Sequence, residues 1–264
     1  LVRIGGEVMT FTRSGDVFTV VRGQRNTLAT THKALDTVQL CKEYAGQKAQ
    51  NIAYDLLVNF ANVDPVYITK SEWDAEQTAY LPRLYNTLLT TPTGVSKLLT
   101  ELTEQIGFFL FWDEVAEKIR FQTIRPNSPS ETVTALNNNE HLLADSLKLR
   151  DIVGDRVNEV WVYYGVLDPT KNLSEDSNYA VIYVASNLAD QSDNQNRDIR
   201  IKKILSRWIT GRAAAIELGS RYLERFALAP IEADFMLDAK DSNLKLCDFV
   251  TVESPQKQGF DGSP

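Results

Sequence analysis

Alternating side chains on either side of a short turn constrain the start of this chain more than any other feature. Residues 7–13 and 16–22 each alternate between the two faces of an extended strand, and Ser14-Gly15-Asp16 separates the two runs. Two such runs joined by a short connection that contains glycine are typical of an antiparallel hairpin. The sequence therefore predicts a β-hairpin, followed by a polar loop of unusual length over residues 23–34 and a further strand over residues 36–41.

Apolar side chains spaced three and four residues apart predict several helices further along the chain. Thr93 is the expected N-cap of one of them and Gly107 its expected C-cap, while Ser71 is the expected N-cap of a shorter helix. A weak helical pattern covers residues 139–144. The expected helices cover residues 49–60, 71–80, 93–107, 139–144 and 211–227.

Most of the remaining segments have the pattern of strands. They do not alternate regularly with the helices, so the sequence predicts an α+β fold with mostly antiparallel sheets. The expected domains are a hairpin module over residues 1–45, an α+β domain over 46–150 and a β-rich domain with one long helix over 151–264. The expected strands cover residues 84–90, 108–112, 119–124, 147–153, 157–166, 179–185, 199–208, 231–238 and 248–253, and a polar loop covers residues 187–198.

Charge and hydropathy exclude two broad classes of function. The 28 basic and 35 acidic side chains give a net charge of −7 without a basic stripe, so a nucleic-acid binder is not expected. The longest apolar run, residues 160–167, is far shorter than the roughly 20 residues that span a bilayer. The chain lacks a signal peptide and an initiating Met and opens inside an apparent strand, so we expect the ordered part of a longer polypeptide.

The cysteines and histidines do not form a recognisable site. Cys41 and Cys247 lie far apart without a CxxC pair, so no zinc or iron–sulfur site is expected, and we predict two buried thiols. A disulfide between them stays open. His32 and His141 have no partner at a ligand or triad spacing, so each is expected to have a surface or packing role.

Carboxylates cluster in three places where a hydrolase could place a catalytic pair. Each cluster also has a structural interpretation, as a helix start, a turn and the outer face of a strand. A GxSxG motif is absent, and Gly5-Gly6 is not a phosphate loop, so we assign no catalytic, cofactor or metal residue and expect no enzyme. The clusters are Glu72, Asp74 and Glu76; Asp113, Glu114 and Glu117; and Glu232 with Asp234.

Two further groups of side chains indicate contacts rather than chemistry. The basic side chains Arg22, Arg25 and Lys33 either hold an acidic neighbour or organise the loop itself, and the second role is favoured. The aromatic runs over residues 108–112 and 161–164 are either core strands, which is the favoured interpretation, or part of a subunit interface.

Several segments of the sequence resemble segments of a family of bacteriophage tail hub proteins. The first is Ile4-Gly5-Gly6-Glu7 through Arg13-Ser14-Gly15-Asp16 to Arg22-Gly23-Gln24-Arg25-Asn26-Thr27 and His32. Similar segments are Trp73-Asp74-Ala75-Glu76, Pro92-Thr93-Gly94-Val95 with Trp112-Asp113-Glu114, and Arg221-Tyr222-Leu223 through Pro230-Ile231-Glu232 to Phe260-Asp261-Gly262. Together, in this order, they cover most of the chain.

The resemblance implies a structural role in a virion. Hub proteins of this kind form a threefold ring at the tail tip, which closes the tail tube, contacts distal tail and tube proteins, and carries central and side fibres. DNA passes through the ring without specific binding, and the acidic chain suits such a channel. The resemblance makes residues 23–32 a docking element. The four cysteines of an iron–sulfur cluster are absent, so no cofactor is implied. A tail-associated cell-wall hydrolase and a receptor-binding module stay open as alternatives.

Overall fold

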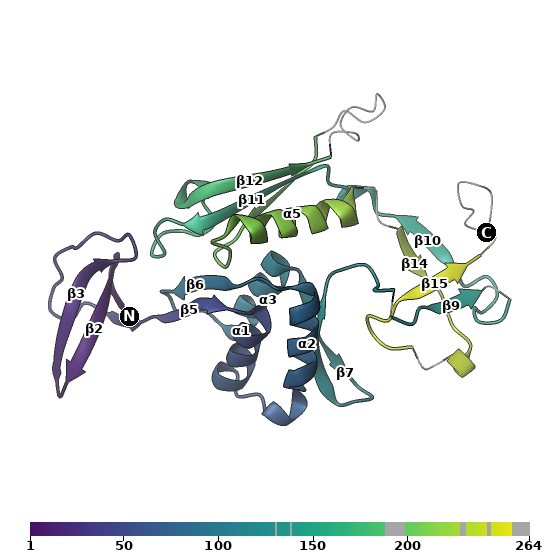
Figure 1. The fold of residues 1–264 in the computed structure, drawn as a ribbon, viewed down its shortest axis with the longest axis horizontal. Coiled ribbons are helices and arrows are strands. Elements are labelled where there is room, and N and C mark those ends of the chain that lie inside the picture. The colour runs from purple at the N-terminus through teal and green to yellow at the C-terminus, as the bar shows by residue number, and fades with distance from the viewer. Residues whose placement is uncertain (130, 138, 188–198, 228–230, 242–243, 255–264) are drawn as a thin grey trace.

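The structure is a computed structural model that describes residues 1–264 except 130, 138, 188–198, 228–230, 242–243 and 255–264. Helices and small, mostly antiparallel sheets are mixed along the chain, which confirms the predicted α+β class. The molecule is elongated, with a sheet projecting at the N-terminal end and two small sheets at the opposite end (Figure 1). Among the described residues, no helix is both long and apolar enough to cross a bilayer.

The N-terminal sheet confirms the predicted hairpin. Strands β2 (Glu7–Ser14) and β3 (Val17–Gln24) pair antiparallel, and the sheet continues through β1 (Val2–Ile4) to β4 (Val38–Leu40). Strand β4 is shorter than the predicted strand over residues 36–41, and the sequence did not indicate that β1 lies at the centre. The sheet buries few apolar side chains, namely Val2, Val8 and Met9.

The middle of the chain forms a helical layer with two strand pairs. The first predicted helix is confirmed, although its last turn is a π-helix, and Gly107 is confirmed as a left-handed C-cap with a φ of 91°. Two predicted N-caps are wrong, because the helices begin after Thr69 and Gly94 rather than after Ser71 and Thr93. The elements are β5 (Lys42–Gln47) paired with β6 (Tyr85–Leu89), α1 (Ala49–Asp55), η1 (Leu56–Phe60), η2 (Pro65–Tyr67), α2 (Lys70–Tyr80), α3 (Val95–Ile106), and β7 (Phe108–Asp113) paired with β8 (Lys118–Thr123).

A three-stranded sheet and the long helix α5 cover this layer (Figure 1). Strand β11 (Glu159–Val166) pairs antiparallel with β12 (Tyr179–Ser186) and parallel with β13 (Ile201–Leu205). Helix α5 (Arg212–Phe226) packs on β11 and β12. The predicted loop over residues 187–198 lies almost entirely outside the described residues.

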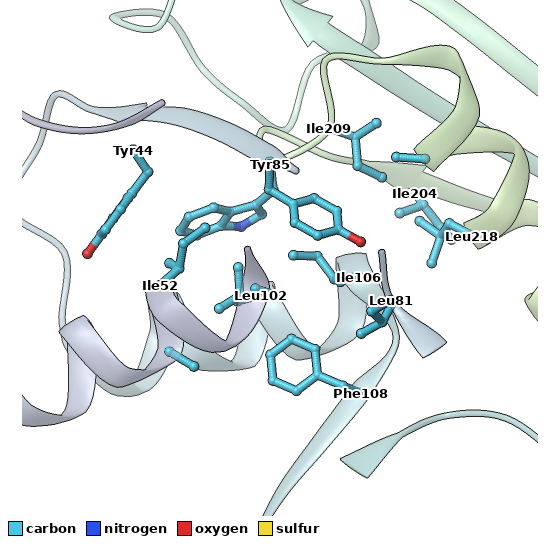
Figure 2. Close-up of a cluster of buried hydrophobic side chains, with 14 of the residues drawn as sticks. Tyr44, Ile52, Leu81, Tyr85, Leu102, Ile106, Phe108, Ile204, Ile209 and Leu218 are labelled. Atoms are coloured by element: carbon cyan, nitrogen blue, oxygen red, sulfur yellow. The ribbon is translucent and has the colours of Figure 1, made fainter. Parts of the chain in front are cut away.

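One apolar core joins the two layers. Ile204, Ile209 and Leu218 from the upper layer meet side chains of the helical layer such as Leu102 and Ile106 (Figure 2). Trp208 is fully buried in the same core. The division into three domains stays a prediction.

Two small sheets form the other end of the molecule around a second, smaller core of Leu136, Leu142 and Leu147. The predicted helix over residues 139–144 is wrong, since Leu142 instead forms an isolated bridge with Leu237. The Asn137 side chain accepts hydrogen bonds from the backbone amides that follow it, which favours a turn over a helix. The strands are β9 (Thr134–Asn137), which was not predicted, paired with β15 (Val250–Glu253), and β10 (Lys148–Asp151) paired with β14 (Ile231–Asp234); short helices are η3 (Val153–Asp155), η4 (Asp176–Asn178) and η5 (Ala239–Asp241).

Gly219 sets how closely α5 approaches the sheet. A Cβ atom there would lie 3.1 Å from Tyr183 Cε1 and 3.2 Å from Ala185 Cβ, both on β12. We expect Gly219→Val to lower the free energy of unfolding by about 2 kcal/mol, because overpacking forces the helix away from the sheet. Urea denaturation measures the loss, with Glu224→Val on the exposed side of α5 as a control for the helix propensity of valine. Equal losses in the two variants would contradict the close packing.

Candidate functional site

The projecting N-terminal sheet exposes apolar side chains on both of its faces. On strand β3, Phe18 and Val20 lie on one face, and Val17 and Val21 lie on the other. Their exposed fractions range from 40% for Val20 to 67% for Val17. A sheet usually buries one face against a core, and contiguous exposed apolar surface marks an interaction site. We call strands β1 to β4 with their connecting loop the projecting sheet.

The loop and the opposite edge of the projecting sheet extend the apolar surface. Leu28 is 80% exposed and Leu35 is fully exposed in the long loop, while Val38 and Leu40 on β4 are 60% and 67% exposed. Burial of an apolar side chain of this size gives about 1.5–3 kcal/mol, so a partner that covers several of them would bind with substantial free energy.

A buried glutamate holds the loop against the sheet. The Glu7 side chain is completely buried, and its two oxygens accept hydrogen bonds from Arg22 Nε at 2.6 Å and Arg22 Nη2 at 2.5 Å. The same carboxylate accepts from the amides of Gly23 at 2.9 Å and Thr30 at 3.0 Å. His32 Nε2 lies 2.8 Å from Glu7 Oε2, and because an ionised carboxylate only accepts, the hydrogen of that bond lies on Nε2.

These bonds make the loop a fixed part of the surface. The Arg22 guanidinium is the main cause that holds the pKa of Glu7 well below its usual range, and the amides of Thr30 and Gly23 add to the effect. Gly23 has a φ of 60°, and a Cβ atom there would lie 3.2 Å from the Thr27 carbonyl, so glycine fits this position best. Arg22 therefore organises the loop, as the sequence favoured, and Arg25 pairs with Glu43 nearby.

The sequence indicated neither the role of Glu7 nor its bond to His32, which is a packing contact of the kind expected for that histidine. The partners lie 15 to 25 residues apart in the chain and meet only when the sheet forms. The one available signal was a glutamate directly before the apolar pair Val8-Met9 in a predicted strand. A carboxylate in such a position needs a buried cation or several donors.

The first two carboxylate clusters meet in one cleft of about 700 Å³ beside β7 and β8. Glu72 and Asp113 both bind Arg120, with Asp113 Oδ2 3.0 Å from Arg120 Nε. Hydrogen bonding by the Ala116 amide and by Arg120 holds the pKa of Asp113 below its usual range. A carboxylate that stays ionised is a poor general acid, so Asp113 is suited to its ion pair with Arg120 rather than to that role.

Glu76 forms an ion pair with Arg125 in the same cleft. The Arg125 side chain is 8% exposed, and it lies 3.3 Å from Glu76 Oε1 and 2.6 Å from Glu131 Oε1. Its hydrogen bond lowers the pKa of Glu131 to about 2. Glu114 lines the same cleft, whereas the other carboxylates of the three clusters lie elsewhere. Asp74 binds Lys70, and Glu117 lies in the β7–β8 turn. Glu232 and Asp234 lie on β14, and Glu232 pairs with Arg150 on β10.

The other singled-out side chains lie apart from one another. His141 Nδ1 accepts a hydrogen bond from the Asn137 amide at 3.2 Å. Cys41 is half-buried, but Cys247 is exposed, so its predicted burial is wrong, and both are free thiols. Among the described residues, no group of His, Cys, Asp and Glu side chains is arranged to hold a metal ion.

The two aromatic runs divide between core and surface. Phe108 is buried in the core, whereas Phe109 and Trp112 on the same strand are 40% and 43% exposed. On β11 the side chains alternate, so that Val162 and Tyr164 are buried while Trp161 and Tyr163 are half-buried.

Solved structures that resemble this chain include a virion chain and a prophage tail protein. No protein-family model and no curated protein matches the sequence. A chain from the virion of a native gene transfer agent particle has a TM-score of 0.55 and 15% identity, over 80% of this chain and 43% of that one. The 43 kDa tail protein of prophage MuSo2 from Shewanella oneidensis has a TM-score of 0.44 and 12% identity, over 93% of this chain and 68% of that one. The first value indicates a shared fold, in which this chain spans less than half of the virion chain's length.

Proposed function

We propose that this chain is a structural component of a phage tail or a related particle and works by forming interfaces. The observation that carries the proposal is the projecting sheet, whose strand β3 exposes apolar side chains on both faces. The fold shared with a chain of a gene transfer agent virion supports it, as does the resemblance to tail hub segments. The arginine-bound carboxylates of the cleft support a role without catalysis.

In its finer form, the proposal is a hub ring at the tail tip. The ring is a homotrimer that closes the tail tube, contacts distal tail and tube proteins, anchors central and side fibres, and lets DNA pass through its lumen. Three domains, over residues 1–45, 46–150 and 151–264, build each subunit.

The distribution of charge supports head-to-tail contact between subunits. Residues 1–47 contain six basic and four acidic side chains, which gives +2, while residues 48–264 contain 22 basic and 31 acidic side chains, which gives −9. The projecting sheet lies at one end of the long axis (Figure 1). A basic end that meets the acidic body of the next copy makes a heterologous interface, and such interfaces close into rings when the rotation permits.

The double substitution Val17→Asp/Val21→Asp tests the proposal. It puts two charges on one face of β3. We expect the unmodified chain to form oligomers and the variant to be monomeric at micromolar concentration, because burying those charges unpaired is costly. Analytical ultracentrifugation measures the mass, and electron microscopy shows the assembled particle. Val115→Asp in the β7–β8 turn, 79% exposed, is the matched control and should leave the oligomer unchanged.

Three results would contradict the proposal. One is a chain that stays monomeric at high concentration and is absent from any particle. A second is purified protein that clears peptidoglycan and loses that activity on Glu72→Gln or Glu114→Gln, which would favour a hydrolase. A third is direct binding to host cells or glycans in a pull-down, which would favour a receptor-binding module.

A further inference from the structure

One face of helix α5 continues beyond the apolar core. Five residues of α5 lie on the same side of the helix, because the second and third lie three and four residues after the first, and the last two lie four residues further on. They are Leu218, Arg221, Tyr222, Arg225 and Phe226. Leu218 packs in the core, but the later four residues line an open cavity of about 250 Å³. We call this cavity the α5 socket. Its opposite wall comes from the end of α3, strand β7 and Ile124.

The walls of the α5 socket are apolar and largely aromatic. The rings of Tyr222 and Phe226 stack with their centroids 5.8 Å apart. Across from them, Phe108 is buried, while Phe109 stays 40% exposed. Aromatic walls of this kind suit an aromatic or branched aliphatic group, which would be removed from water on entry.

The rim of the α5 socket carries two arginines whose guanidinium groups are not fully paired with hydrogen-bond acceptors of the described residues. The Arg225 guanidinium lies 5.9 Å from the Phe109 ring centroid and 5.5 Å from that of Phe226, and no carboxylate among the described residues pairs with it. Arg221 donates through Nη2 to the Tyr80 carbonyl and to Glu217, but its buried Nη1 has no acceptor within the described part of the chain.

A carboxylate would complete this rim. Two parallel N–H groups of the Arg225 guanidinium match the two oxygens of a carboxylate. Among the described residues, Glu104 is the one acidic side chain that lines the α5 socket, and it opposes an incoming anion. Arg225 stands against it, and Arg221 adds a positive charge that its pairing with Glu217 partly offsets.

The volume of the α5 socket distinguishes between two kinds of occupant. Pockets for whole small-molecule ligands usually enclose about 300–1,000 Å³. A cavity of about 250 Å³ is smaller, and it is suited to one large side chain, as in the anchor pockets of protein interfaces. We propose that the α5 socket receives one aromatic or branched aliphatic side chain of a partner protein, next to an aspartate or glutamate that binds Arg225. This inference does not depend on the proposed function.

Matched probes test the apolar and the acidic parts of the inference. The unmodified chain is titrated by NMR with 3-phenylpropionate and with 3-phenylpropan-1-ol, which have the same ring and differ in the charged head. We expect the amides of Gly107, Phe109 and Ile124 to shift with both probes, and the carboxylate to bind about tenfold more tightly, as a charge-assisted hydrogen bond predicts. Arg225→Met should remove that preference, so that the acid and the alcohol bind this variant with equal affinity.

Controls separate the socket from general charge effects and from other occupants. Arg212→Met removes an exposed arginine at the other end of α5 and should change neither affinity. A capped Asp-Phe dipeptide should displace 3-phenylpropionate, and a capped Asn-Phe dipeptide should do so about tenfold less well. Equal affinities for acid and alcohol, shifts confined to other surfaces, or no shifts at all would overturn the socket. Binding of the two small probes without displacement by the dipeptide would overturn the partner protein as occupant.

Discussion

Replacing Trp208 with alanine is expected to lower the free energy of unfolding by about 4 kcal/mol. Trp208 is completely buried in the segment that joins β13 to α5, and its ring centroid lies 6.2 Å from that of Tyr44. The backbone of the same segment is tied to both layers, since Asn86 N donates to the Trp208 carbonyl at 2.9 Å and Gly165 N donates to the Ile209 carbonyl at 3.1 Å. With the backbone held in place, the site cannot collapse and the cavity persists.

Trp208→Phe separates packing from hydrogen bonding at this position. The indole Nε1 is buried without an acceptor among the described residues, so phenylalanine loses volume but no hydrogen bond. We expect a loss of about 1–2 kcal/mol for this variant, in line with the smaller volume that is removed. Urea denaturation monitored by circular dichroism measures both values. A loss below 1 kcal/mol for Trp208→Ala would show that Trp208 does not join the two layers.

Local periodicity explains what could be predicted of the fold. The stripes of α1, α3 and α5 and the alternation of β2 and β3 are set by neighbouring residues, so their side-chain patterns are visible in the sequence. Thr69 and Gly94 were missed as helix starts because the Thr69 side chain makes no capping hydrogen bond, glycine has no side chain to make one, and better capping residues lie close by. The parallel pairing of β13 with β11 depends on a contact across about 40 residues, which no local pattern encodes.

The functional surfaces were less predictable, because they depend on contacts between residues that lie far apart in the sequence. Exposed apolar side chains on β3 have the same alternation as buried ones, so the sequence could not show that both faces of this strand are open. The convergence of Glu72 and Asp113 on Arg120 joins residues from α2, β7 and β8. The aromatic run on β11 divides between core and surface because its side chains alternate, so the favoured interpretation as a core strand describes only part of the run.

Glu7→Gln is expected to release the loop of the projecting sheet. An amide cannot accept two hydrogen bonds from Arg22 and two from the backbone while also meeting His32, so several buried donors lose their partner. Breaking a buried ion pair of this kind costs about 3 kcal/mol, which should lower amide protection over residues 1–45 by about a hundredfold. Hydrogen exchange with mass spectrometry measures the protection, and the main core should keep its own protection because Glu7 lies outside it.

The matched control for this variant is Glu43→Gln, which breaks the more exposed pair with Arg25 and should cost less than about 1 kcal/mol.

Acid should reproduce the effect of Glu7→Gln. Because the pKa of Glu7 is held far below its ordinary value of 4.5, its carboxylate stabilises the sheet fully above that pH. The stabilisation is lost as the pH falls below 4.5, so the difference in protection between the unmodified chain and Glu7→Gln should shrink there. A difference that stays constant from pH 6 to about pH 2 would mean that the charge of Glu7 does not hold the loop, and that the apolar surface of the projecting sheet is ordered by something else.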